Sequence, residues 1–312
     1  MLMRGLQVQL QKTKLRQTCE CKALRDIILE NLGVALYPYQ LPLSDLILQK
    51  AIEGGPQEID LQWSRQSGKT ETLIQTALAL ALYKIRWLQE DYRVAFIAPS
   101  KEEQVVVVTR GRIRKYALRL KPWLNATMGI RTLLDEGLRT ADLIFRSSSG
   151  FEAPFRCVSA NPSAFVKGHT MQLMLFEQVE EMDETKMLED IMPFGAGSET
   201  GCLNILAGSC APSVTNNYYY RAMMDRKERG PPLFVDWKLA ERYKPGYGDY
   251  VRDQMGKHGE DSDTFRTQYG NEWILPRNKL IDRARLMALT YSDPSVLDKR
   301  NLRAAGIDIA KQ

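Results

Sequence analysis

Long hydrophobic runs are missing from the 312-residue sequence. The purest apolar stretch, Leu73 to Tyr83, still contains Gln75 and Thr76 and is far shorter than the ~20 residues that a membrane-spanning helix needs. The N-terminal segment also lacks an apolar region followed by a small-residue cleavage site, which argues against secretion. We therefore expect an intracellular protein without a membrane span.

Histidine is scarce, and the cysteines do not form a recognisable pattern. The chain has two histidines, His169 and His258, and an odd number of cysteines, five. Cys19 and Cys21 make one Cys-x-Cys pair, but no second pair follows at the spacing of metal ligands. We expect reduced thiols rather than a disulfide framework or a structural zinc site.

A strong charge imbalance is absent as well, since the net charge is +5. Hydrophobic residues make up 44% and charged residues 26%, as in an ordinary globular protein, so disordered and fibrous classes are poor explanations. The basic surplus is compatible with an anionic partner but does not demonstrate one. The length suggests about two domains, or one large domain with attachments.

Short apolar strands alternate with amphipathic helices along the chain. Residues 59–63 alternate apolar and polar side chains as in a strand, and a helical pattern follows over 70–88. The apolar run 93–98 is followed by a second helical pattern over 102–120, so the order repeats. This alternation predicts a parallel α/β sheet. Further predicted elements are helices over 15–32 and 44–52, a hairpin over 143–160, and strands over 172–176, 203–207 and 233–237.

A candidate phosphate-binding loop, Ser64 to Thr70, lies between the first of these strands and its helix and has the sequence S-R-Q-S-G-K-T. It matches the last three positions of the Walker A pattern G-x-x-x-x-G-K-[ST], whereas Trp63 stands in place of the first glycine. Gly68 would let the backbone approach phosphate, Lys69 would neutralise phosphate charge, and the Thr70 hydroxyl would ligate magnesium. The loop predicts a nucleotide-binding site.

This loop, with its internal arginine and its missing first glycine, resembles that of the large terminase subunits of tailed bacteriophages. In that family an N-terminal ATPase drives DNA into procapsids. The resemblance spans residues 37–310 and implies an α/β ASCE-type P-loop NTPase fold, with a mainly parallel sheet flanked by helices and a small C-terminal lid/linker subdomain. It implies ATP and Mg²⁺ as ligands, with the nucleotide bound by Ser64, Arg65, Gln66, Ser67, Gly68, Lys69 and Thr70.

Two other segments resemble motifs of the same family. The segment Tyr37-Pro-Tyr39-Gln40 looks like the adenine-recognition element, in which a glutamine amide can donate to and accept from the base. Taken alone, it would be interpreted as a capped turn before a helix. Gly208 and Ser209, at the end of a predicted strand, resemble the coupling motif, in which a small hydroxyl senses the γ-phosphate.

Glu177 and Gln178 stand where the family has Asp-Glu after a strand of four apolar residues. There the first acid holds magnesium through water and the second polarises the attacking water. The resemblance therefore assigns Glu177 to magnesium, together with Thr70, and Gln178 to the catalytic position. A glutamine can position water by hydrogen bonding but cannot accept its proton, so Gln178 is a departure from the pattern.

Three explanations of this departure stay open. Gln178 could be an introduced substitution that holds ATP without turnover, in which case Gln178→Glu should raise ATPase activity by orders of magnitude. It could be natural variation in which Glu180 or Glu181 contributes a carboxylate. Alternatively, Glu177 itself handles the water while Thr70 holds magnesium.

Arg65 is a candidate catalytic residue, because an arginine beside the γ-phosphate stabilises the charge that develops in the transition state. The alternative is an arginine that simply pairs with a loop carboxylate. A second arginine acting from a neighbouring subunit is also compatible with the resemblance, but several arginines fit that role.

The resemblance divides the chain into four parts. These are an N-terminal helical extension (1–34), a P-loop ATPase core (35–224), a lid/linker subdomain (225–300) and the start of a truncated nuclease domain (301–312). Asp308 lies in the last part, where the first metal-binding aspartate of the nuclease would be. We interpret the chain as the ATPase portion of a longer protein.

The implied function is the ATPase motor of viral genome packaging, which moves double-stranded DNA into a procapsid. The implied partners are DNA, gripped mainly through its phosphates, a portal protein, the small terminase subunit and further copies of the chain in a ring, expected to be a pentamer. The implied location is the host cytoplasm, transiently at the procapsid portal. The alternatives are a helicase-like nucleic-acid translocase and a hydrolysis-deficient, nucleotide-dependent assembly module, which Gln178 favours.

Overall fold

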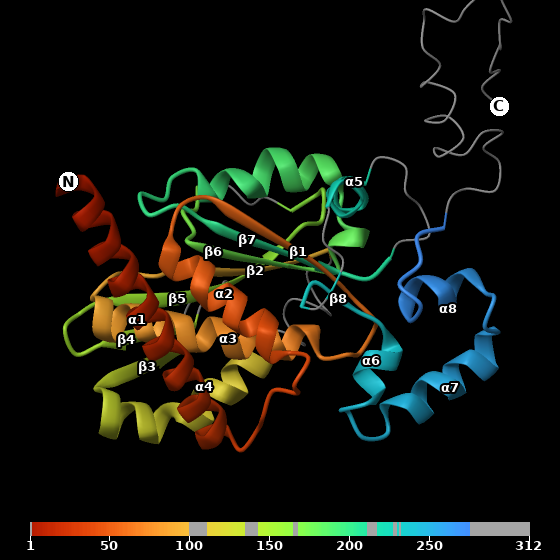
Figure 1. The fold of residues 1–312 in the computed structure, drawn as a ribbon, viewed down its shortest axis with the longest axis horizontal. Coiled ribbons are helices and arrows are strands. Elements are labelled where there is room, and N and C mark those ends of the chain that lie inside the picture. Colours follow the sequence, from red (N-terminus) through yellow and green to blue (C-terminus); the bar gives the residue numbers. More distant parts are fainter. Residues whose placement is uncertain are drawn as a thin grey trace, which may run out of the picture. The chain divides into compact units, whose positions relative to one another are not determined.

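An eight-stranded sheet forms the centre of the computed structural model (Figure 1). The strand order is β3-β4-β5-β2-β6-β7-β1-β8. Neighbours from β5 to β8 are parallel, whereas β3, β4 and β5 pair antiparallel, which confirms the predicted mainly parallel sheet. The strands are β1 (Gln57–Trp63), β2 (Val94–Ala98), β3 (Ile130–Leu134), β4 (Leu143–Ser147), β5 (Glu152–Ser159), β6 (Leu173–Glu177), β7 (Leu203–Gly208) and β8 (Phe234–Val235).

The structure describes residues 2–99, 111–134, 143–164, 168–210, 217–226, 230 and 232–274. The chain divides into one unit over 1–274 and a second over 275–312. The second unit lies outside the described residues, and with it the end of the predicted lid/linker and the predicted nuclease strand around Asp308. The predicted boundaries between the four parts of the chain stay predictions.

Helices cover the sheet, and α1 to α4 gather on one of its faces (Figure 1). Among the described residues, no helix is both long enough and apolar enough to cross a membrane. The α-helices are α1 (Leu2–Leu32), α2 (Leu41–Glu53), α3 (Lys69–Tyr83), α4 (Gly111–Trp123), α5 (Tyr218–Asp225), α6 (Trp237–Glu241), α7 (Tyr247–His258) and α8 (Asp263–Gln268). Shorter helical turns are π-helical over Lys84–Leu88, Leu124–Met128 and Lys186–Ile191 and 3₁₀ over Val179–Glu181 and Met192–Gly195.

Both faces of the central strands are buried. Because successive strand residues point to opposite faces, Phe96 and Leu175 pack in the core beneath α1 to α4, while Ile97 and Phe176 pack in a second core with α5 and the turns near residue 190. The continuous apolar runs of β2 and β6 follow from this arrangement, since a parallel strand covered on both sides has no solvent face.

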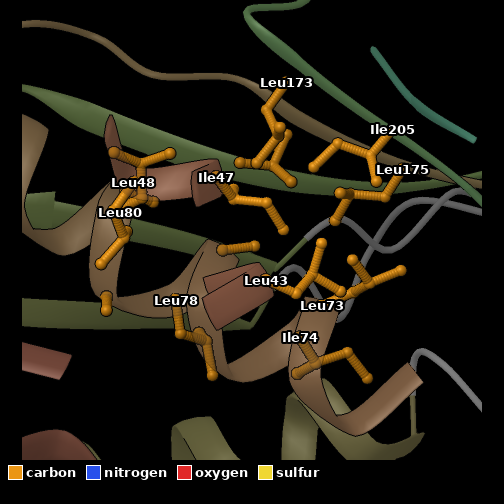
Figure 2. Packing of buried hydrophobic residues seen from close by; sticks show 14 of the residues in the cluster. Leu43, Ile47, Leu48, Leu73, Ile74, Leu78, Leu80, Leu173, Leu175 and Ile205 are labelled. Atoms are coloured by element: carbon orange, nitrogen blue, oxygen red, sulfur yellow. The ribbon is translucent and has the colours of Figure 1, made fainter. Parts of the chain in front are cut away.

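The larger core joins the sheet to α2 and α3. Figure 2 shows Leu43 and Ile47 of α2 and Leu73 of α3 close to Leu173 and Ile205 of the sheet. All five side chains are almost completely buried. This packing fixes the start of α3, and therefore the loop before it, relative to β6 and β7.

The structure differs from the sequence predictions at several elements. α1 begins at Leu2 rather than at residue 15, and the strand predicted over 233–237 is limited to β8, because Trp237 already belongs to α6. Asp60 and Gln62, the polar residues of the alternating pattern in β1, are buried along with its apolar residues. The helix predicted over 70–88 ends its α-helical part at Tyr83 and continues as a π-helical turn. The edge strand β3 was not predicted, and it pairs antiparallel with β4. The predicted helix over 102–120 can be compared only from Gly111, where α4 begins.

The topology brings three strand ends to one edge of the sheet. β6, β7 and β1 are adjacent and parallel, so their carboxyl ends lie side by side. The candidate phosphate loop follows β1. Glu177 is the last residue of β6, and Gln178 comes directly after it. Gly208 is the last residue of β7, and Ser209 follows it. In open α/β sheets, ligands bind at the carboxyl ends of the strands.

Candidate functional site

A cleft of about 510 Å³ opens at this edge of the sheet. It brings together most of the predicted site residues, which come from three separate strand ends. Predicted residues that line it are Arg65, Gln66, Gly68, Lys69, Thr70, Glu177, Gln178 and Ser209. The remaining predicted residues do not line it; these are Tyr39, Gln40, Ser64, Ser67 and Gly208.

Gly68 is required by both the conformation and the packing of the loop. Its φ of 99° lies in the left-handed region, which L side chains rarely adopt. A Cβ at this position would also lie 2.3 Å from Nε2 of Gln40. The glycine therefore lets the backbone turn into α3 and leaves the amide groups at the start of that helix free to face an anion.

Tyr39 and Gln40 hold the phosphate loop from behind. The Tyr39 hydroxyl donates to the carbonyl of Ser67 (2.5 Å), and Nε2 of Gln40 donates to the carbonyl of Gly68 (3.3 Å). Oε1 of Gln40 accepts from the backbone N–H of Tyr37 (2.7 Å). Both side chains are buried, so their observed role is to fix the loop, and adenine recognition by them stays a prediction.

Lys69 lies at the first position of α3, with its ammonium group folded over the loop. Nζ donates to the carbonyls of Trp63 (2.7 Å) and Ser64 (3.3 Å). Burial lowers the pKa of Lys69, while Glu180 and Glu177 oppose this effect. Trp63, which replaces the first Walker glycine, is fully buried, and its side chain is part of the larger core.

Thr70 and Glu177 meet across the cleft. The Thr70 hydroxyl donates to Oε2 of Glu177 (2.7 Å), which joins the start of α3 to the end of β6. The other oxygen, Oε1, is buried and has no hydrogen-bond partner among the described residues. Burial also raises the pKa of Glu177. A hydroxyl beside a carboxylate with a free oxygen is the oxygen-only environment that Mg²⁺ prefers, so the residues fit the ion implied by the sequence.

Gln178 makes a sharp turn at the end of β6. Its φ of 54° is left-handed, and the 3₁₀ turn Val179–Glu181 follows at once. This turn places Glu180 in the cleft beside β7. Oε1 of Glu180 accepts from the backbone N–H (3.0 Å) and the hydroxyl (2.7 Å) of Ser209.

Arg65 contacts a part of the chain that is distant in sequence. Nη1 donates to Oε1 of Gln268 (2.8 Å), and its backbone N–H donates to the carbonyl of the same residue (2.7 Å). This partner is an amide from α8, so the described contacts do not include the ion pair with a loop carboxylate that was the alternative for Arg65. The guanidinium lies at the cleft, where it can reach a bound anion.

Several cleft residues were missed at the sequence level. Lys244 and Tyr247 donate to the carbonyls of Gln66 and Arg65, both at 2.6 Å. Arg112 of α4 lies 3.5 Å from Glu71 of α3. About 180 residues separate Lys244 and Tyr247 from the loop they bind, and no local pattern connects them to it.

Comparisons with known proteins place this architecture among bacteriophage terminases. No family model and no curated protein matches the sequence. The structure is similar over 79% of this chain to the large terminase ATPase domain of Thermus phage P74-26 (97% of that chain, 16% identity, TM-score 0.56). It is similar over 77% of this chain to the large terminase of bacteriophage HK97 (51% of that chain, 16% identity, TM-score 0.56). The large terminase of a thermophilic bacteriophage, in complex with ADP, matches over the same share (54% of that chain, 12% identity, TM-score 0.51).

The sheet, its flanking helices and the loop before α3 define an α/β P-loop NTPase fold. The solved structures narrow this to the fold of the ATPase domains of bacteriophage large terminases, as the sequence motifs implied.

Proposed function

We propose that this chain is the ATPase domain of a large terminase and that it drives double-stranded DNA into a procapsid by hydrolysing ATP. The observation that carries the proposal is the Thr70–Glu177 hydrogen bond, made directly beside the phosphate loop. It joins a helix-start hydroxyl to a strand-end carboxylate, which are the two protein ligands that P-loop NTPases use for magnesium. The similarity to terminase structures, one of them an ADP complex, supports the same interpretation.

The phosphate loop binds the nucleotide through its backbone and Lys69. The N–H groups after Gly68 point along the start of α3, where the helix dipole favours negative charge. When the nucleotide binds, the ammonium group of Lys69 replaces its hydrogen bonds to the carbonyls of Trp63 and Ser64 with hydrogen bonds to phosphate oxygens. Arg65 neutralises charge that builds up on the γ-phosphate during hydrolysis.

Thr70 and Glu177 would hold Mg²⁺ between them. When bound, the ion neutralises charge on the phosphate oxygens. The hydrogen bond between the two side chains already sets their separation, so little rearrangement is needed when the ion arrives. Oε1 of Glu177, which is buried and has no hydrogen-bond partner among the described residues, would be a ligand for that ion.

A basic helix face next to the cleft supports DNA as the partner. α4 contains no acidic residue, and its side chains Arg114, Lys115, Arg119 and Lys121 are exposed. Arg112 of the same helix lines the cleft, so α4 links the nucleotide to this surface. Contacts of this kind go to phosphates, and they suit a motor that must tolerate any DNA sequence.

The proposal extends to the assembly in which the motor works. A ring of copies, expected to be a pentamer, would dock on a portal protein, with the small terminase subunit delivering DNA. The chain would act in the host cytoplasm and transiently at the procapsid portal. These partners follow from the proposed terminase function.

A second candidate is a nucleotide-dependent assembly module with impaired hydrolysis. Gln178 favours it, because this amide occupies the place where the terminase pattern has its catalytic glutamate and cannot accept a proton.

Steady-state phosphate release from Mg·ATP, measured with and without linear duplex DNA, tests the proposed motor. We expect turnover that duplex DNA stimulates more than single-stranded DNA of equal length. Tight ATP binding with no turnover under any condition would contradict the motor and support the assembly module. Stronger stimulation by single strands would support a helicase-like translocase instead.

A further inference from the structure

We propose that Glu180 is the general base of this ATPase, in place of the residue at position 178. The proposal rests on the proposed ATPase function and deepens it, because it names the proton acceptor of that reaction. Gln178 lines the cleft but has no group that can take a proton from water. Glu180 lines the same cleft and has one.

The backbone explains how a residue two positions beyond Gln178 reaches the site. The left-handed turn at Gln178 ends β6, and the 3₁₀ turn over residues 179–181 carries the chain back across the end of β7. Val179 is buried in the second core and anchors this turn. Glu180 and Glu181 then both line the cleft, and Glu181 is the more exposed of the two.

Both carboxylate oxygens of Glu180 are enclosed, and only one of them has a hydrogen-bond partner among the described residues. Oε1 accepts two hydrogen bonds from Ser209, and the backbone carbonyl of Glu180 accepts from Nδ2 of Asn217 (3.1 Å). Oε2 is buried and has no hydrogen-bond partner among the described residues. A buried acceptor of this kind is costly to leave unpaired, so its persistence points to a partner that arrives with the substrate.

Gly208 leaves the space that this carboxylate occupies. A Cβ at Gly208 would lie 2.4 Å from Oε2 of Glu180 and 2.8 Å from the ring of Tyr219. Any other residue at the end of β7 would displace the carboxylate. The glycine that the sequence assigned to nucleotide binding therefore serves the site indirectly, by making room for Glu180.

The surroundings raise the pKa of the Glu180 carboxyl. Burial raises the pKa of Glu180, and Lys69 and the two hydrogen bonds from Ser209 oppose that rise. A carboxylate is a better proton acceptor when its pKa is moved toward the working pH.

The proposed step balances without any further reactant. The oxygen of a water molecule forms a bond to the γ-phosphorus of ATP, and the bond from that phosphorus to the β,γ-bridging oxygen breaks. ADP leaves with the bonding electron pair, and the proton of the water passes to the carboxylate of Glu180.

Glu180→Gln tests the assignment because it keeps the shape and the hydrogen bonds from Ser209 but removes the base. We expect phosphate release to fall by at least ~100-fold, the range of general-base catalysis, while the Kd for a fluorescent ATP analogue stays close to that of the unchanged chain. Glu189→Gln, an exposed carboxyl outside the cleft, is the matched control.

The possible results separate the two proposals. A Glu180→Gln variant that binds ATP and retains more than a tenth of the activity would overturn the role of Glu180, as would a rise by orders of magnitude in Gln178→Glu. An unchanged chain that does not bind ATP would instead contradict the proposed function. If Glu180→Gln fails to fold, Ser209→Ala supplies the second test, since it frees the carboxylate from its hydroxyl partner and should lower turnover without weakening ATP binding.

Discussion

At the scale of single residues, the site depends on two glycines that leave space for neighbouring side chains and on two carboxylates that each have an oxygen without a hydrogen bond within the described part of the chain. Gly68 and Gly208 each keep a Cβ out of a position where it would collide with Gln40 or Glu180. Glu177 and Glu180 each keep one buried oxygen without a partner among the described residues. Such carboxylates lower stability in the absence of ligand, as functional sites commonly do.

Gly68→Ala should damage the loop rather than the fold as a whole. The left-handed φ and the 2.3 Å approach to Gln40 together should cost about 1–3 kcal/mol and abolish tight ATP binding. Gly256→Ala is the matched control, because this glycine lies inside α7 with nothing within 4 Å of the added Cβ and should gain up to ~1 kcal/mol. Urea unfolding and ATP titration of both variants check the prediction, which equal effects would contradict.

Glu180→Gln should change how stability depends on pH. Since burial raises the pKa of Glu180, the folded protein holds this proton more tightly than the unfolded chain, and stability falls as pH rises from about 4.5 through the raised pKa. Glutamine carries no charge at either end of this window. The variant should therefore be more stable than the unchanged chain at pH 8, by about 1.4 kcal/mol for each unit by which folding raises the pKa of Glu180. At pH 4.5 the stabilities of the two proteins should be closest. Urea midpoints at both pH values test this, and a gap that does not widen with pH would contradict it.

At the scale of the elements, the central strands of the sheet could be predicted from the sequence, whereas the edge strand β3 could not. β2, β6 and β7 are short continuous apolar runs, and burial on both faces preserves that signal. β3 carries no such run, because it is an edge strand that pairs only with β4. The phosphate loop was identified from a local motif, whereas Lys244 and Tyr247 reach it only through tertiary folding.

The contact between α1 and α2 depends on a buried charge. The Arg25 side chain is 5% exposed, pairs with Asp45 and Asp26, and donates to the Ser44 hydroxyl (3.1 Å). Arg25→Ala should lower the free energy of unfolding by about 2 kcal/mol, because it leaves partly buried partners without their cation. Arg16, 81% exposed on the same helix, is the control, and Arg16→Ala should cost less than about 0.5 kcal/mol. Chemical unfolding of the two variants compares them, and equal losses would show that burial does not decide the effect.

At the scale of the whole molecule, the small net charge conceals an uneven distribution. The chain carries only +5, yet α4 presents a helix face of arginine and lysine without one acidic residue. A net value near zero is therefore no argument against a polyanionic partner when the cations gather on one element. The small net charge also suits the proposed ring, in which several subunits would share the contacts with DNA.

Removing two cations from α4 should weaken DNA binding in a way that salt reveals. With Lys115→Ala and Lys121→Ala combined, we expect lower affinity for duplex DNA and a salt slope reduced by about 1.8, since each phosphate contact contributes about 0.9. Lys257→Ala, an exposed lysine on α7 paired with Asp253, is the control. Fluorescence anisotropy over a salt series measures both. A slope that is unchanged in the double variant would place the DNA elsewhere.

The central claim is that the cleft beside α3 binds Mg·ATP, and titration of ATP into the unchanged chain and Lys69→Ala tests it most directly. Lys69 lies at the cleft and contributes a cation rather than core volume, so the variant should remain folded, although it loses the contacts of Nζ with the carbonyls of Trp63 and Ser64. We expect ATP affinity to fall by more than ~100-fold, about 2.8 kcal/mol. A folded Lys69→Ala variant that binds Mg·ATP as tightly as the unchanged chain would contradict the claim.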